Sequence, residues 1–169
     1  MISEYMSQKD ILLGCMLIAY LIPIIYVYCQ FADNPSICNI ICNEKAKYMI
    51  TASMVMMGAF TIQYERERKD MTSMIIIICL LFGIYGLIFT YNSFWIHLGF
   101  AIIAFLSILG FMLYHTQKHG SNGLRILLLI AAYFAIMTIA FFNQNIFLTE
   151  ALFIGTFAVY YLSLHFMES

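Results

Sequence analysis

Apolar residues occur along the chain in six long runs that are separated by short polar stretches. The runs cover approximately residues 11–29, 47–63, 73–90, 94–114, 124–142 and 147–166. A helix needs about 20 apolar residues to cross the hydrocarbon core of a bilayer. The pattern therefore predicts an all-α polytopic membrane protein, a bundle of six transmembrane helices that forms a single domain over residues 1–169.

Composition supports the membrane class. The chain is 63% hydrophobic and 10% charged, whereas soluble domains have about 25% charged residues. The net charge of -1 favours neither nucleic acid nor an acidic partner. We expect an integral membrane protein, with membrane lipids and other membrane proteins as its partners.

Basic residues predict the orientation, because cytoplasmic loops collect Lys and Arg. With six spans, both termini and the second and fourth loops lie on one side. That side carries Lys9, Arg66, Arg68, Lys69, Lys118 and Arg125, and the other carries only Lys45 and Lys47. Both termini are therefore predicted to be cytoplasmic.

The first outer loop contains two cysteines, Cys38 and Cys42, four residues apart. On an oxidising side of the membrane these thiols could form a disulfide across one helical turn, and the alternative is two free thiols. A zinc site is not expected in this loop, because a second ligand pair with matching spacing is missing.

Charged residues close the second run in the segment YERERKD. Glu65 with Lys69 and Arg66 with Asp70 are four residues apart, a spacing that pairs side chains on a helix surface. We predict a solvated helical extension; a docking site for a cytosolic partner is the alternative.

Two histidines, His115 and His119, follow the fourth run at the same spacing and would share a helix face. Gly120 and Gly123 indicate that the helix does not continue that far. We therefore predict no metal site there, and the sequence implies no cofactor.

Two ionisable residues stand at the heads of predicted spans. Glu150 opens the sixth run and His97 lies near the start of the fourth. An ionisable group inside the bilayer is costly and normally faces a partner, a cavity or the interface. Both spans run from outside to inside, so the two residues lie at the same depth. We predict a ligand-binding cluster open to the outer leaflet, formed by His97 and Glu150 with Asn92, Gln144 and Asp33. The alternative is that the two side chains only stabilise the packing of the bundle or extend to the membrane interface.

Several functions are excluded by what the runs lack. No span contains the lysine that a retinal protein needs, no TVGYG-like potassium filter is present, and serine hydrolase, P-loop and dinucleotide motifs are missing. No catalytic residues are predicted, and we expect that the protein is not an enzyme.

The sixth span resembles the closing helix of the FRAG/DRAM/SFK family of six-helix membrane proteins. In that family a Glu opens a helix rich in Phe and Tyr, as Glu150 does here. The remaining similar positions are Phe157, Tyr160, Tyr161 and Ser163 in the same span, His97, Ala101, Phe105 and Phe111 in the fourth, Arg125, Ala131 and Ala132 in the fifth, and Tyr64, Arg66 and Arg68 after the second. The resemblance implies a multi-spanning protein of an endomembrane or the plasma membrane. It also implies a link to autophagy regulation, to lipid remodelling of GPI anchors, or to lipid organisation or phosphoinositide signalling.

Together these patterns predict an integral membrane protein that binds or organises lipid near His97 and Glu150. Two alternatives stay open. One is a structural membrane subunit of a larger assembly, such as a multiprotein complex or a virion membrane. The other is a membrane enzyme acting on lipids, with His97 and Glu150 as acid and base.

Overall fold

The computed structural model describes residues 7–30, 44–90, 93–141 and 146–168. All six apolar runs are helical, and the described residues form no other regular structure. The helices are α1 (Gln8–Gln30), α3 (Glu44–Arg68), α4 (Met71–Phe89), α5 (Phe94–His119), α6 (Asn122–Ala140) and α7 (Phe147–Glu168). The prediction of an all-α bundle is confirmed.

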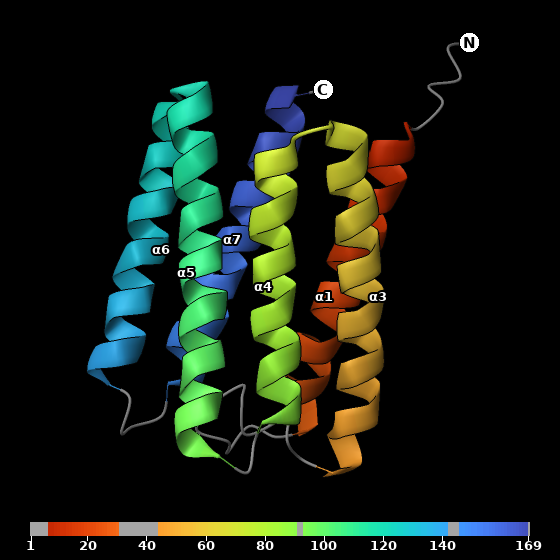
Figure 1. Cartoon of the computed structure of the whole chain (residues 1–169), viewed down its shortest axis with the longest axis vertical. Helices are drawn as coiled ribbons and strands as arrows, with labels where there is room; N and C mark the ends of the chain where they lie inside the picture. Colours follow the sequence, from red (N-terminus) through yellow and green to blue (C-terminus); the bar gives the residue numbers. More distant parts are fainter. Residues whose placement is uncertain (1–6, 31–43, 91–92, 142–145, 169) are drawn as a thin grey trace.

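The helices stand side by side and alternate in direction along the chain (Figure 1). Consequently α1, α4 and α6 start at the same end of the bundle where α3, α5 and α7 finish. We call this end, which also holds both chain termini in Figure 1, the termini end. Arg66, Arg68 and Lys118, three of the basic residues used for the orientation, therefore belong to one end of the molecule.

Four helices are long and apolar enough to cross a membrane. Their mean hydropathies are 2.5 for α4, 2.3 for α5, 2.1 for α6 and 1.5 for α7. Large apolar side chains also remain on the outside of these helices, for example Phe82, Leu106 and Ile136, which are 59%, 63% and 65% exposed. Such surfaces match a hydrocarbon solvent better than water.

Close packing of α4 on α5 depends on two glycines of α4, Gly83 and Gly86. A Cβ added at Gly83 would lie 2.8 Å from the backbone nitrogen of Ala104, and one at Gly86 would meet the Phe100 ring. The absence of a side chain lets the two backbones approach, the usual role of small residues in membrane bundles.

Helices α3 and α5 continue well past the ends of their apolar runs, and both extensions lie at the termini end. The second run ends near residue 63, but α3 continues to Arg68; the fourth ends near residue 114, but α5 continues to His119. Between α3 and α4 the chain turns within two residues, through Lys69 at a φ of 58° and then Asp70, which caps α4. This tight turn brings the charged end of α3 against the first turn of α4.

Candidate functional site

Glu65 lies at the centre of a buried polar cluster at the termini end. Its side chain is fully buried, so the predicted solvated extension is wrong at this residue. One carboxylate oxygen accepts hydrogen bonds from Tyr161 and Arg68, and the other accepts from Ser73 at 2.5 Å. The predicted surface pair of Glu65 with Lys69 is replaced by an ion pair with Arg68 three residues away.

Arg68 joins α3 to α7. Its guanidinium is only 2% exposed and donates two hydrogen bonds to Glu168, from Nε at 2.8 Å and from Nη2 at 2.7 Å. Nη1 donates to both oxygens of Glu65 at 3.0 and 3.2 Å. Such two-pronged pairing uses the planar fork of the guanidinium. The neighbouring Arg66 is exposed, so one helical turn presents one arginine to the interior and one to the surroundings.

The proton positions around Ser73 follow from its single hydroxyl proton. Because the ionised Glu65 carboxylate can only accept, Ser73 donates its proton to that carboxylate. The Nε2 atom of His115, 3.1 Å from the Ser73 oxygen, must then be the donor in their contact. His115 therefore carries its proton on Nε2, and Arg68 Nη2 lies 3.3 Å from its Nδ1 and 3.4 Å from its Nε2.

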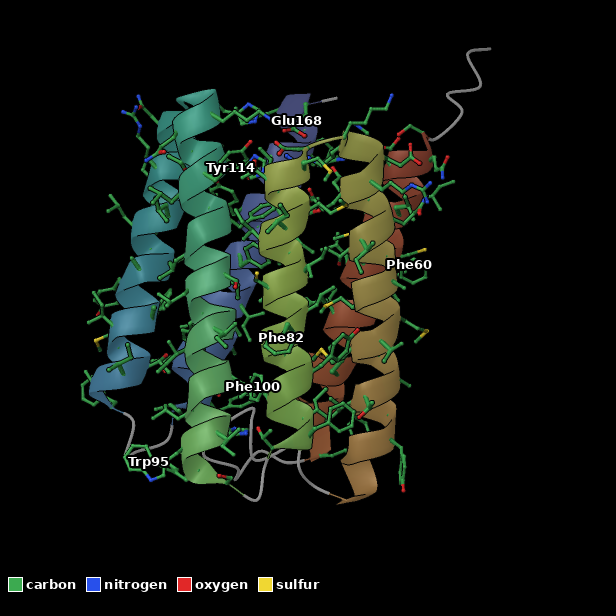
Figure 2. All side chains as sticks on the ribbon, viewed as in Figure 1. Phe60, Phe82, Trp95, Phe100, Tyr114 and Glu168 are labelled. Atoms are coloured by element: carbon green, nitrogen blue, oxygen red, sulfur yellow. The ribbon has the colours of Figure 1, made fainter. Side chains whose placement is uncertain are left out.

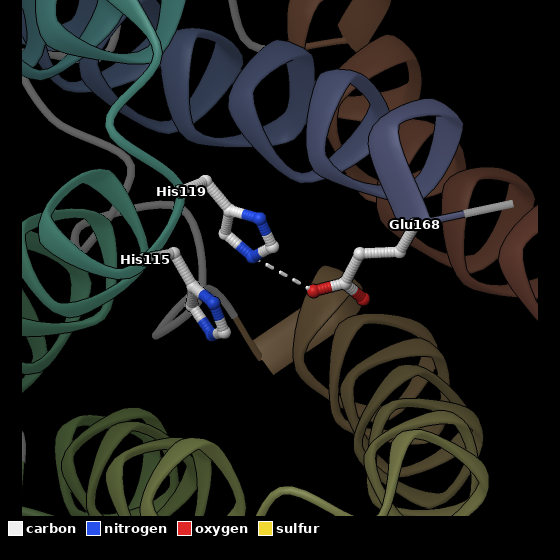
Figure 3. Close-up of side chains that lie close together, drawn as sticks. All are labelled: His115, His119 and Glu168. Atoms are coloured by element: carbon white, nitrogen blue, oxygen red, sulfur yellow. Dashed lines mark hydrogen bonds and ion pairs between the residues drawn. The ribbon is translucent and has the colours of Figure 1, made fainter.

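The second histidine of α5 lies in the same cluster, because the helix reaches His119 and stops just beyond it. Gly120 adopts the left-handed conformation that ends a helix, with φ at 63°. The expectation that Gly120 stops the helix before His119 is therefore wrong. His115, His119 and Glu168 converge in Figure 3, with His119 Nε2 3.1 Å from Glu168 Oε1 and the two imidazole rings stacked at 5.9 Å.

We call the group formed by these seven side chains the charged network. Its members are Glu65, Arg68, Ser73, His115, His119, Tyr161 and Glu168. The network links α3, α4, α5 and α7. Its polar groups satisfy one another, which is the condition under which charges are tolerated away from water.

A second ion pair borders the network. Asp70 accepts hydrogen bonds from Lys118 at 2.6 Å, from the Tyr114 hydroxyl at 3.1 Å and from the backbone N–H of Ser73. Partial burial raises the pKa of Asp70, but these three donors outweigh it and hold the pKa at about 2. Asp70 therefore stays ionised at physiological pH and ties α4 to α5.

On the other side of the bundle His165 joins α1 and α3 to α7. Its Nδ1 lies 2.7 Å from the Tyr64 hydroxyl and its Nε2 lies 2.9 Å from a carboxylate oxygen of Asp10. The side chain of His165 is 4% exposed and Tyr64 is buried. Tyrosine, histidine and aspartate in this order resemble a proton relay, but the tyrosine hydroxyl is closed off from any substrate.

An apolar cavity of about 70 Å³ lies beneath the charged network. Helices α1, α3, α4 and α7 enclose it, and Tyr161 belongs to both the cavity wall and the network. The lining is Leu13, Met16, Leu17, Tyr20, Met57, Thr61, Ile77, Leu80, Leu81, Ile154, Phe157, Ala158 and Tyr161. The hydroxyl of Tyr20 is buried and has no hydrogen-bond partner in the described part of the chain.

The predicted pair of His97 and Glu150 lies at the end of the bundle opposite the network. Glu150 is 7% exposed at the start of α7, and His97 is half-buried near the start of α5. Within the described ranges no hydrogen bond or ion pair joins their side chains, and the His97 Nδ1 atom has no partner there. Their role as ligand-binding residues stays a prediction.

The other predicted site residues fall outside the described ranges. They are Asp33, Cys38, Cys42, Asn92 and Gln144. The cysteines that the structure does describe, Cys15, Cys29 and Cys79, are free thiols.

Sequence reasoning missed the charged network, although it had noted five of its members for other reasons: Glu65, Arg68, His115, His119 and Tyr161. The one available signal was the surplus of ionisable residues just beyond three different spans that share a side: Glu65 and Arg68, His115 and His119, and Glu168. Read within one helix, each group looks like a solvated surface. The three groups become partners only because their helices finish at the same end of the bundle.

Comparisons with protein-family models, with curated proteins and with solved structures find no match to this chain. The similarity to the FRAG/DRAM/SFK family therefore rests on the residues quoted above.

Proposed function

We propose that this is a non-catalytic, six-span integral membrane protein with cytoplasmic termini that binds lipid in the manner suggested by its FRAG/DRAM/SFK resemblance. The observation that carries the proposal is the apolar cavity between α1, α3, α4 and α7. An acyl chain is its natural occupant, since the lining offers aliphatic and aromatic surface and the surrounding solvent is hydrocarbon.

Tyr20 adds to this site a hydroxyl group that needs a hydrogen-bond acceptor. Its ring lines the cavity and its buried hydroxyl has no partner among the described residues. A buried donor without an acceptor costs about 1 to 3 kcal/mol. An acyl ester supplies both the apolar chain and a carbonyl acceptor, so a glycerolipid fits this site better than a free hydrocarbon.

The absence of catalysis is supported by the charged network. Glu65 and Arg68, its central charges, are 0% and 2% exposed and are paired with each other and with Glu168. A general acid or base must reach the substrate proton. These groups bind one another instead, and of the charged network only Tyr161 lines the cavity.

The proposal is tested by filling the cavity. Ala158 lines it, and the adjacent Val159 is 52% exposed on the outside of α7. In purified protein in detergent we expect Ala158→Phe to retain several-fold less diacyl phospholipid after washing than the wild type, as measured by mass spectrometry of the bound lipid. Val159→Phe, which adds a ring to the same helix outside the cavity, should retain as much as the wild type.

Melting temperatures of both variants serve as the folding control. Equal lipid retention by the wild type and a folded Ala158→Phe would overturn the proposal. Equal loss in the two variants would also overturn it, because the lipid would then be bound on the outer surface. Tyr20→Phe should weaken retention of ester lipids more than that of their ether analogues.

A further inference from the structure

His115, His119 and Glu168 form a group that the lipid-binding function leaves unused. One ligand atom from each of the three side chains lies within 4.8 Å of the others. The two histidines come from successive turns of α5 and the carboxylate from the last turn of α7 (Figure 3). We propose that this group is a binding site for a divalent cation of the zinc type.

The ligand set fits zinc. Imidazole nitrogens and a carboxylate oxygen are the ligands that zinc accepts at about 2.0 to 2.2 Å, and two His with one Glu leave a fourth position open for water or another ligand. The ligand atoms need only small side-chain movements to reach one ion. His119 and Glu168 are each 20% exposed, so an ion can enter from the termini end.

Hydrogen bonds around the group already prepare one ligand. The Ser73 hydroxyl donates to Glu65 and so forces His115 to donate from Nε2, which leaves the Nδ1 lone pair available. Metal-binding histidines typically donate their other ring N–H in this way, which fixes the ring and its tautomer. Here Ser73 supplies that support from α4.

Charge in the network also favours a cation. Glu65 and Glu168 bring two negative charges to the single positive charge of Arg68. The nearby Lys118 is already paired with Asp70, and the Asp10 carboxylate is bound to His165. One negative charge therefore remains without a fixed cation beside His119.

Arg68 is the group that the metal ion must partly displace. Its Nη2 holds Glu168 Oε1 at 2.7 Å and lies 3.3 Å from His115 Nδ1. Its Nε holds the other carboxylate oxygen, Oε2, at 2.8 Å. A cation bound to Oε1 and Nδ1 removes the Nη2 contacts and leaves the Nε contact in place, so the bridge between α3 and α7 survives metal binding.

The test uses the full-length protein in detergent with Zn²⁺ or Co²⁺ as the only added ligand. We expect one equivalent of Zn²⁺ per chain by calorimetry, and an absorption spectrum of the Co²⁺ form typical of low-coordinate nitrogen and oxygen ligands. His119→Ala, which removes a ring that is 20% exposed, should weaken Zn²⁺ binding about tenfold or more. Ser73→Ala, which removes the hydrogen-bond partner of a ligand, should weaken it about 10 to 100-fold.

His97→Ala is the matched control, because it removes a histidine from the opposite end of the bundle and should leave Zn²⁺ affinity unchanged. Glu168→Gln keeps hydrogen bonding to Arg68 but should lose the metal. No Zn²⁺ binding by folded wild type would overturn the proposal, and so would equal affinity in the wild type, His119→Ala and Glu168→Gln proteins. Thermal unfolding of each variant without metal verifies that it is folded.

Discussion

The two ends of the bundle hold their polar residues in different ways. At the termini end, the buried Arg68 of α3 pairs with Glu65 of the same helix and with Glu168 of α7. Asp70, the cap of α4, pairs there with Lys118 of α5, whose side chain is 44% exposed. At the opposite end, Trp95 and Tyr48 are 79% and 85% exposed, and the His97 Nδ1 atom has no partner in the described ranges. Figure 2 shows the contrast, with Tyr114 and Glu168 at one end and Trp95 at the other. His97 and Glu150, which drew attention in the sequence, lie at the end away from the charged network.

This difference teaches that a charged segment next to a span is not necessarily a surface. The same segment, residues 65–70, contains a fully buried Glu65, an exposed Arg66 and a buried Arg68 side chain. Partners from other helices decide which charges are buried. Four substitutions or conditions test how much each end contributes.

The largest effect is expected at Arg68. Arg68→Ala removes the only cation that contacts both Glu65 and Glu168 in the described network and leaves two carboxylates short of a partner. Removing one member of a buried ion pair costs about 3 to 5 kcal/mol. The measurement is the free energy of unfolding in detergent. Arg66→Ala, in the same turn but exposed, should change it by no more than about 0.5 kcal/mol; similar losses for both would contradict the burial of the network.

A smaller effect is expected where α4 meets α5 between the two ends. Gly83→Ala places a methyl group 2.8 Å from the Ala104 backbone nitrogen, so the helices must separate, at a cost of about 1 to 3 kcal/mol. Gly110→Ala is the control, because nothing lies within 4 Å of the added atom. It should stabilise by about 0.5 to 1 kcal/mol through helix propensity. The measurement is the denaturant midpoint of unfolding, which should fall for Gly83→Ala and rise for Gly110→Ala.

Acid should weaken the termini end through Asp70. Its pKa is about 2 in the folded protein against an ordinary 3.8, so its ion pair contributes fully above 3.8 and is lost as the pH falls from 3.8 toward 2. We expect a contribution of about 1 kcal/mol after allowing for solvent screening of Lys118.

Comparing the wild type with Asp70→Asn isolates the contribution of the Asp70 charge to stability, because the amide keeps the cap of α4 while removing the charge. The difference in free energy of unfolding between the two proteins should shrink over that pH interval. A difference that stays constant down to the folded pKa would refute the assigned role of the carboxylate.

The smallest effect is expected for the predicted pair at the opposite end. Because no direct contact joins His97 to Glu150 in the described ranges, the double substitution to alanine should equal the sum of the single changes within about 0.5 kcal/mol. A larger coupling energy would mean that the two residues act together, as the sequence hypothesis held.

Hydropathy predicts the helices of this protein well, because about 20 apolar residues leave the backbone few alternatives in a membrane. Hydropathy is less informative for the polar residues at the ends of the helices. Gly120 marks the end of α5, yet a glycine at that position lies just after the last helical residue, so His119 remains helical. Glu65 formed plausible pairs within its own segment, and its real partners, Tyr161 and Ser73, belong to helices that no local pattern connects to it.

The pairing of Arg68 with Glu168 also has a consequence for biosynthesis. These residues are separated by 100 positions, so four further helices are synthesised between Arg68 and its acceptor at the end of α7. During that interval Arg68 has Glu65 of its own helix as a partner, but its two hydrogen bonds to Glu168 are still missing. We expect the termini end to assemble only when the last turn of α7 has emerged. Quality control that recognises unpaired charges near the bilayer could then distinguish chains with a docked α7 from those without one.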